Sequence, residues 1–119
     1  MNPSRVLTSS LFLVLLSTTA ARAQGIDCRE VMVPMRDGTR LAADVYIPKE
    51  QGPGPFPVVI ERTPYDKGKC DSEDAQYFAK RGYVAIRQDE RGRYLSEGEY
   101  YWLRDEGWGE RRDGYDTIE

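Results

Sequence analysis

The sequence predicts an α/β protein built on an open sheet that its 119 residues do not complete. Three observations indicate this class: a hairpin pattern over residues 31–47, two short apolar runs at 57–60 and 83–86, and an amphipathic segment between the runs. A strand, a crossover helix and a second strand form a parallel unit that is right-handed in nearly all known cases. The predicted architecture is therefore a β-hairpin followed by a strand-helix-strand unit.

Strict alternation around a turn predicts the hairpin. Val31, Val33 and Met35 alternate with other residues up to Asp37-Gly38, a dipeptide typical of tight hairpin turns. The second strand ends at Pro48, and its two faces carry Leu41, Ala43, Val45 and Ile47 on one side and Arg40, Ala42, Asp44 and Tyr46 on the other. This period of two is typical of a half-buried antiparallel strand.

The parallel unit follows a loop rich in glycine and proline. Its two apolar runs lack polar alternation, which is typical of strands buried on both faces. Asp71 or Ser72 can cap the intervening helix, which stops at Gly82 and presents an apolar stripe of Ala75, Phe78 and Ala79. The helix is therefore expected to cover one face of the sheet.

Residues 89–119 predict a long loop and the start of a helix. Residues 89–109 combine glycine, charge and aromatic side chains without periodicity, with a helical turn expected near 100–103. Loops of this length usually serve a site. A helix beginning at Asp113 has barely one turn, too few residues to be stable alone. Because one helix and this turn cannot cover both faces of a parallel sheet, we expect the fold to be incomplete.

The amino terminus has the three parts of a secretory signal peptide. Arg5 provides the charged start, residues 6–16 the apolar core, and Ala21-Arg22-Ala23 a small-residue site that places cleavage between Ala23 and Gln24. The core is shorter than the roughly 20 residues that span a bilayer, which favours a removed signal over a retained anchor. We expect residues 1–23 to be the signal peptide and residues 24–119 to be secreted or periplasmic, without membrane association.

Charge argues against nucleic acid as a partner. Loss of residues 1–23 removes Arg5 and Arg22 and shifts the formal net charge from −3 to −5. The remaining basic residues alternate with acids, as in residues 110–113, and do not form the clustered basic face that nucleic acids or anionic membranes require. The oligomeric state stays open.

The cysteine and histidine content limits the disulfides and metal sites that the chain can form. Cys28 and Cys70 are an even count in an exported chain, which permits one disulfide, although spacing alone cannot show that the two residues meet. The chain has no histidine, and two isolated thiols are too few for a zinc site. We therefore predict no metal and no cofactor.

The segments that follow the two buried strands are the best candidates for a site, because sites in open α/β sheets gather at the carboxyl ends of the strands. In Thr63-Pro64-Tyr65 the proline fixes the backbone before a tyrosine. A protonated phenol can donate a hydrogen bond to a developing oxyanion. Taken alone, such a tyrosine is more typical of surface packing.

Other polar and aromatic residues of these loops have plainer interpretations. Asp89, Arg91 and Gly92 are expected to turn the chain at a strand end. The adjacent opposite charges of Asp66 and Lys67 predict an exposed turn. Trp102 and Trp108 fit either an acyl pocket or packing that lacks its partners.

Three ordered blocks carry a family resemblance: residues 33–41 (VPMRDGTRL), 62–67 (RTPYDK) and 88–100 (QDERGRYLSEGEY). Together they resemble the X-Pro dipeptidyl-peptidase and cocaine esterase family of α/β-hydrolases, from about Arg29 to Glu119. Residues 114–119 look like the family's helix before the nucleophile strand. The resemblance implies an α/β-hydrolase fold of which this chain is the amino-terminal portion.

The resemblance also implies a serine hydrolase with a Ser-Asp-His triad and an oxyanion hole completed by a tyrosine hydroxyl, for which Tyr65 is the matching position. The Gly-x-Ser-x-Gly elbow is absent, since neither Ser72 nor Ser96 lies in one, and no histidine can act as base. The nucleophile, base and triad acid thus have no counterpart in this chain, which we expect to be inert alone.

Two functions remain open at this stage. The first is an exported serine hydrolase that cleaves ester or amide bonds of a small-molecule or peptide acyl substrate, represented here by its amino-terminal part. The second is a short non-catalytic binding or interaction protein, or a nonfunctional truncated product. The acyl group of the substrate cannot be predicted from these residues.

Overall fold

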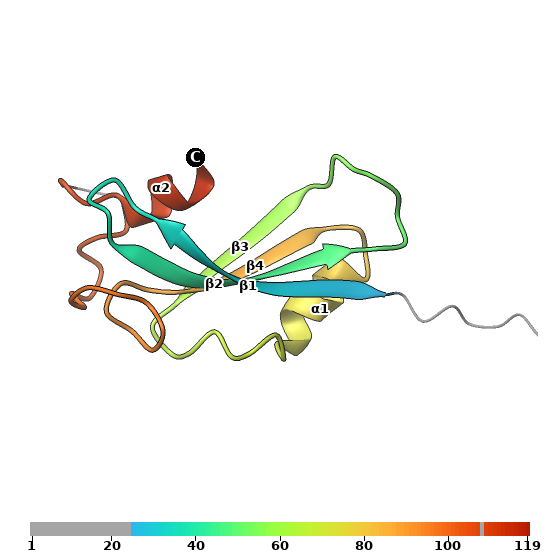
Figure 1. The fold of residues 1–119 in the computed structure, drawn as a ribbon, viewed down its shortest axis with the longest axis horizontal. Coiled ribbons are helices and arrows are strands. Elements are labelled where there is room, and N and C mark those ends of the chain that lie inside the picture. The colour runs from blue at the N-terminus through green and yellow to red at the C-terminus, as the bar shows by residue number, and fades with distance from the viewer. Residues whose placement is uncertain (1–24, 108) are drawn as a thin grey trace, which may run out of the picture.

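A computed structural model describes residues 25–107 and 109–119 of the protein. It contains a four-stranded sheet in the order β1-β2-β4-β3 with a helix on each side (Figure 1). The elements are β1 (Ile26–Pro34), β2 (Arg40–Pro48), β3 (Val58–Thr63), α1 (Glu73–Ala79), β4 (Val84–Asp89) and α2 (Asp113–Ile118). The predicted signal peptide, residues 1–23, and its cleavage site at Ala23 and Gln24 lie outside the described residues.

The predicted hairpin is confirmed, and it is longer than expected. β1 and β2 pair antiparallel with Val33 opposite Leu41, and the Gly38 amide closes the turn by donating to the Met35 carbonyl at 2.8 Å. The prediction of a half-buried second strand is wrong, because Leu41 on one face and Tyr46 on the other are both fully buried. β2 lies inside the sheet, between β1 and β4, so both of its faces can be covered.

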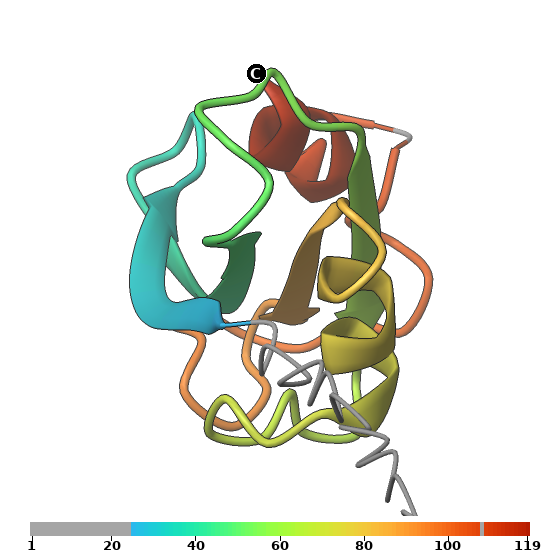
Figure 2. The same ribbon diagram turned by 90° about the vertical axis from the view of Figure 1, so that its right-hand side faces the viewer.

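The predicted parallel unit is also confirmed. β3 and β4 pair in parallel from Val58 opposite Val84 to Thr63 opposite Asp89, and α1 connects them. β4 pairs on its other side with β2 in the antiparallel sense. Figure 2 views the sheet along its strands, with the blue β1 at one edge and β3 at the other. The hairpin therefore extends a parallel pair into one mixed sheet.

A small core lies between α1 and the sheet. Ser72 is the cap of α1, and its side chain accepts a hydrogen bond from the Ala75 amide at 3.3 Å. Ala75 and Ala79 are buried against Tyr46 and Ala85, in accord with the predicted stripe. Phe78 departs from that prediction, since it is 36% exposed and packs edge-on against Tyr77 and Tyr83 at the surface.

The apolar runs of the parallel unit are less buried than predicted. Val58 is 54% exposed, and Ile60 and Ile86 are only half-buried. The reason is coverage: α1 packs on one side of the sheet, and α2 on the other side has only six residues (Figure 1). The sheet thus retains apolar surface of the kind that further elements of an α/β domain cover.

Cys28 on β1 and Cys70 in the loop before α1 form a disulfide, with Cα atoms 5.9 Å apart. That separation lies within the range that a disulfide can bridge. No helix among residues 25–107 and 109–119 has the length and apolar character to cross a membrane.

Candidate functional site

The candidate site lies at the carboxyl ends of the parallel strands. β3 and β4 end level with each other, because Thr63 and Asp89 are register partners. The loop of residues 64–72 leaves β3 and the loop of residues 90–112 leaves β4 from this same end of the sheet (Figure 1). The predicted clustering of the two functional segments is therefore observed.

Tyr65 presents its side chain to solvent from a fixed backbone. The Tyr65 amide donates to the Thr63 hydroxyl at 3.0 Å, which turns the chain immediately after the strand. The Tyr65 side chain is 80% exposed, and its hydroxyl has no hydrogen-bond partner within residues 25–107 and 109–119. A hydroxyl so placed can donate a hydrogen bond to an acceptor outside the chain.

Asp89 connects the loop after β3 to the loop after β4. Its carboxylate is fully buried and accepts hydrogen bonds from the Lys67 amide at 2.7 Å and the Leu95 amide at 3.3 Å. Burial raises the pKa of the Asp89 carboxyl above its usual value. Nearby, Gly92 has a φ of +69°, and a Cβ there would approach the Tyr100 nitrogen to 2.3 Å. The predicted structural role of Asp89 and Gly92 is confirmed.

Lys67 corrects the prediction of an exposed turn. Asp66 is exposed, but the Lys67 side chain is fully buried. Its ammonium donates to Asp44 at 2.7 Å, to Glu30 at 2.8 Å and to the Gly68 carbonyl at 3.1 Å. Burial opposes the charge of Lys67, yet its hydrogen bonds to the two carboxylates hold its pKa above the usual value. A buried ion pair therefore anchors the loop that carries Tyr65.

Asp44 is the partner that sequence reasoning missed. It lies at the centre of β2 and also accepts the Cys70 amide at 2.7 Å, so its carboxylate holds both ends of the segment 67–70. The signal was present in the sequence as a carboxylate in the middle of an otherwise well-patterned strand. A buried carboxylate requires a cationic partner, although the pattern does not show which cation arrives.

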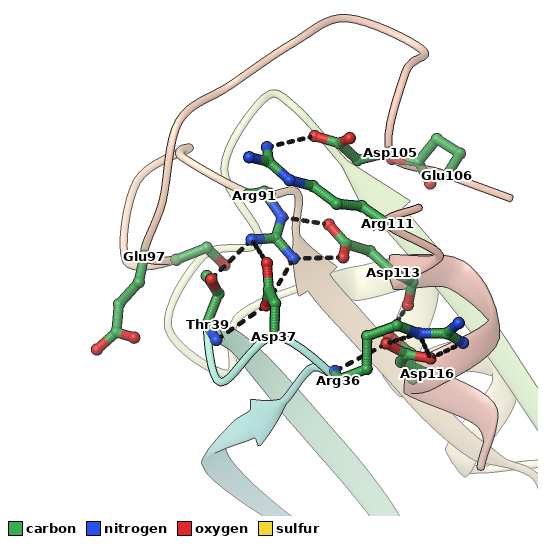
Figure 3. Close-up of polar contacts among 12 residues, drawn as sticks. Arg36, Asp37, Thr39, Arg91, Glu97, Asp105, Glu106, Arg111, Asp113 and Asp116 are labelled. Carbon is green, nitrogen blue, oxygen red and sulfur yellow. Dashed lines mark hydrogen bonds and ion pairs between the residues drawn. The ribbon is translucent and has the colours of Figure 1, made fainter. Parts of the chain in front are cut away.

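Arg91 joins three parts of the chain (Figure 3). Its guanidinium donates to both carboxylate oxygens of Asp113, at 2.8 and 2.7 Å, and to Asp37 at 2.8 Å and the Thr39 hydroxyl at 2.7 Å. Arg91 and Asp113 are buried, and the pKa of Arg91 is raised chiefly by the hydrogen bonds to Asp113. We call Arg91, Asp37 and Asp113 the Arg91 clamp, because it fixes α2 to the hairpin turn.

A second pair supports the clamp at the surface. Arg36 donates through its side chain and its backbone amide to Asp116 of α2, with a closest side-chain distance of 2.5 Å (Figure 3). The predicted helix at Asp113 is thus present, and it is held by two arginines rather than by its own length. These two ion pairs explain how a helix of barely one turn remains folded.

Neither serine of residues 25–119 is free to serve as a nucleophile. The Ser72 hydroxyl caps α1, and the buried Ser96 hydroxyl donates to the Asp89 carbonyl at 2.7 Å while accepting the Ala42 amide at 2.9 Å. Trp102 is 74% exposed, and Trp108 lies outside the described residues. The loop near residues 100–103 forms one turn, in which Arg104 donates to the Tyr101 carbonyl.

The hairpin, the mixed sheet with its parallel pair, and the phenol at the carboxyl edge define the amino-terminal part of an α/β-hydrolase fold. The chain belongs to the family described as X-Pro dipeptidyl-peptidase (S15 family), whose profile matches residues 37–119. The resemblance inferred from the three sequence blocks is therefore confirmed.

Similarity to individual proteins agrees with this family assignment. The chain is 47% identical over 75 residues to the cocaine esterase of Rhodococcus sp. (strain MB1 Bresler), a match that covers 59% of this chain and 13% of the esterase. Among solved structures it resembles an α-amino acid ester hydrolase, with a TM-score of 0.62 and 29% identity over 92% of this chain and 21% of that one. An aminopeptidase from a Thaumarchaeota archaeon has a TM-score of 0.63 and 30% identity over the same shares.

The matched part of the chain spans between 13% and 21% of the length of these relatives. A chimera offers a way to study it inside a complete hydrolase. In this chimera, residues 25–119 replace the structurally equivalent segment of the Rhodococcus cocaine esterase, and all variants below are made in it.

Removing the disulfide is expected to loosen the loop that carries Tyr65. A native disulfide closing a loop of this size contributes about 2–4 kcal/mol, so the paired substitution of Cys28 and Cys70 by serine should speed amide exchange of residues 64–72 by about 10²-fold. Hydrogen exchange with mass spectrometry measures this directly. Unchanged exchange in the double-serine chimera would show that the buried ion pair alone fixes the loop.

The Arg91 clamp is expected to weaken in acid. Hydrogen bonding from Arg91 lowers the pKa of Asp37 from 3.8 to about 2. The unfolded chain therefore takes up the proton first, so the stabilisation is complete above about pH 4 and is lost between about pH 4 and pH 2. Thermal unfolding of the chimera and of Asp37→Asn, followed from pH 5 to 2, should show a smaller loss for the variant. Parallel curves would contradict the assignment.

Proposed function

We propose that this chain is the amino-terminal part of an exported serine hydrolase that cleaves ester or amide bonds, and that Tyr65 donates a hydrogen bond to the oxyanion formed during catalysis. The observation that carries the proposal is the exposed Tyr65 hydroxyl at the carboxyl end of β3, which has no hydrogen-bond partner in the part of the chain that the structure describes. Family membership and the similarity to ester and peptide hydrolases support the reaction class.

An open sheet edge beside this phenol supports the proposal. Among the described residues β3 pairs only with β4, which leaves its outer edge open. A parallel strand added there would lie about 4.8 Å away, with its carboxyl end at the same edge as Thr63. A serine on a strand-to-helix elbow at that end would therefore face Tyr65, and α2 would precede such a strand in the chain.

Tyr65 would act when the substrate carbonyl becomes tetrahedral. The serine hydroxyl gives its proton to the general base as its oxygen bonds to the carbonyl carbon. The π bond of the carbonyl breaks, and its electron pair leaves a negative charge on the former carbonyl oxygen. A donor already fixed near that oxygen stabilises the charge without reorganisation. The chain itself supplies this donor and part of the framework, while nucleophile and base come from the remainder of the hydrolase. We therefore expect residues 24–119 alone to show no ester turnover.

Export is part of the proposal. Its support is the signal-peptide pattern of residues 1–23, together with the Cys28–Cys70 disulfide, because disulfides persist in oxidising compartments. The proposed substrates are small-molecule esters, acyl amides or peptides, in keeping with the ester and peptide hydrolases to which the chain is similar.

Replacing Tyr65 by phenylalanine tests the oxyanion role. In the chimera we expect Tyr65→Phe to lower kcat for 4-nitrophenyl acetate by about 10²–10³-fold with little change in KM, since an oxyanion donor acts in the transition state. Tyr77→Phe is the matched control, because Tyr77 is an exposed tyrosine on α1, away from the site. An equal effect of the two substitutions, or none from Tyr65→Phe, would refute the role.

The coding DNA beyond residue 119 tests the parent hydrolase. We expect it to encode a Gly-x-Ser-x-Gly elbow followed by an aspartate and a histidine in that order. If no frame contains an elbow and a later histidine, the short non-catalytic product becomes the better account.

A further inference from the structure

We propose that Arg93 is a positioning residue for Tyr65: its side chain fixes the peptide unit that joins Pro64 to Tyr65 and thereby aims the phenol. The inference rests on the proposed role of Tyr65 and extends it to a residue that neither the family resemblance nor the comparisons assign. Arg93 acts through Tyr65 and makes no contact with the reacting atoms.

Both ends of one peptide plane are held. Arg93 Nε donates to the Pro64 carbonyl at 2.8 Å, and the amide of the same peptide unit, on Tyr65, donates to the Thr63 hydroxyl at 3.0 Å. A peptide unit is planar, so fixing its oxygen and its nitrogen fixes the orientation of the whole plane. The direction in which the Tyr65 side chain leaves the backbone follows from that plane.

Because residue 64 is a proline, its carbonyl is the group through which a side chain can fix the orientation of the peptide unit. Pro64 has no amide proton and its φ is set by the ring, so the carbonyl is its one backbone hydrogen-bonding group. The Tyr65 amide is already bonded to the Thr63 hydroxyl. The motion that remains near Tyr65 is therefore rotation of the peptide unit that joins Pro64 to Tyr65. Arg93 removes that freedom from a loop 29 residues further along the chain.

Arg93 is itself well fixed. Its guanidinium lies over the rings of Tyr94 and Tyr100, at 5.3 and 5.0 Å from their centroids. Its amide donates to the Glu90 carbonyl and its carbonyl accepts from Ser96, both at 2.9 Å. A planar guanidinium suits this combination of stacking and hydrogen bonding better than an ammonium does. The loop after β4 thus delivers a rigid donor to the loop after β3.

The expected consequence is a loss of turnover with little loss of binding. Catalytic groups must lie close to their ideal position, and a shift of about 1 Å can cost about 10²-fold in rate. Because Thr63 still holds the Tyr65 amide, we expect the loss in Arg93→Met to be partial, about tenfold in kcat with KM within about twofold.

The test is a double-mutant cycle in the chimera. Arg93→Met is made alone and together with Tyr65→Phe, and kcat for 4-nitrophenyl acetate is measured for all four proteins. Arg93→Gln retains an N–H donor and should recover much of the lost rate. Arg81→Met is the control, because Arg81 stacks on Tyr77 at 3.4 Å without contacting the site. Circular dichroism checks that each variant is folded, and Arg93→Ala, which also lacks a side-chain donor, replaces Arg93→Met in the cycle if the methionine variant is not.

The outcomes separate the two proposals. We expect Arg93→Met to lower kcat when Tyr65 is present and to have no further effect in the Tyr65→Phe background. Equal losses in both backgrounds, or no loss in either, would overturn the positioning role. If Arg93→Gln lowers kcat as much as Arg93→Met does, the hydrogen bond to the Pro64 carbonyl does not position Tyr65, and the proposal is overturned. If Tyr65→Phe itself leaves kcat unchanged, the proposed function fails, and the positioning role fails with it.

Discussion

Replacing Arg91 by methionine is expected to detach α2 from the hairpin turn at a cost of about 3–5 kcal/mol, because it leaves the buried Asp113 carboxylate without its partner. In the chimera, amide exchange of α2 should accelerate by at least about 10²-fold. Arg36→Met is the matched control: it removes an arginine bound to the same helix through a more exposed ion pair, so its effect should be much smaller.

A second substitution tests whether a buried, unpaired charge causes this loss. If the cost of Arg91→Met comes from an uncompensated charge, then adding Asp113→Leu should recover a large part of the protection of α2. Protection that is unchanged in Arg91→Met would show that packing against the sheet holds α2 without the clamp. Equal losses in Arg91→Met and Arg36→Met would show that burial of the ion pair is not the deciding property.

Replacing Lys67 by methionine is expected to be similarly damaging, by about 3–5 kcal/mol, because the fully buried Asp44 would lose its cation. The loop of residues 64–72 should open, and hydrogen exchange across it should rise sharply. Activity of the chimera should fall with it, since the same loop carries Tyr65.

Lys69→Met controls for the loss of a lysine in this loop, because Lys69 is exposed and we expect its replacement to change exchange little. Adding Asp44→Asn to Lys67→Met should restore part of the order, since an amide oxygen can still accept the Cys70 hydrogen bond without carrying a charge. If Lys67→Met leaves exchange unchanged, the disulfide alone holds the loop.

Local pattern was sufficient to predict the elements of this fold. The Asp37-Gly38 turn, the two apolar runs and the capped helix specified the hairpin and the parallel unit, because each depends on residues close together in the sequence. The same logic placed Tyr65 at the carboxyl edge. What it could not predict was the exposure of Val58, because burial of a strand depends on elements that pack on it from outside the local segment.

The polar contacts of the site were beyond local pattern. Lys67 meets Asp44 from 23 residues away and Arg93 meets Pro64 from 29, so neither spacing corresponds to a helix turn or a strand repeat. In sequence, each looks like a solvated charge in a polar loop. Only the register of β2, β4 and β3 brings these groups together, and that register is a property of the whole sheet.

A crystal structure of the chimera with a phosphonate bound covalently to its nucleophilic serine would test the central claim most directly, because the phosphonate oxygen occupies the place of the oxyanion. We predict that the Tyr65 hydroxyl lies about 2.7–3.1 Å from that oxygen, with the Pro64 carbonyl still bound to Arg93. A Tyr65 side chain turned away from the phosphonate, with other donors filling the oxyanion hole, would contradict the claim.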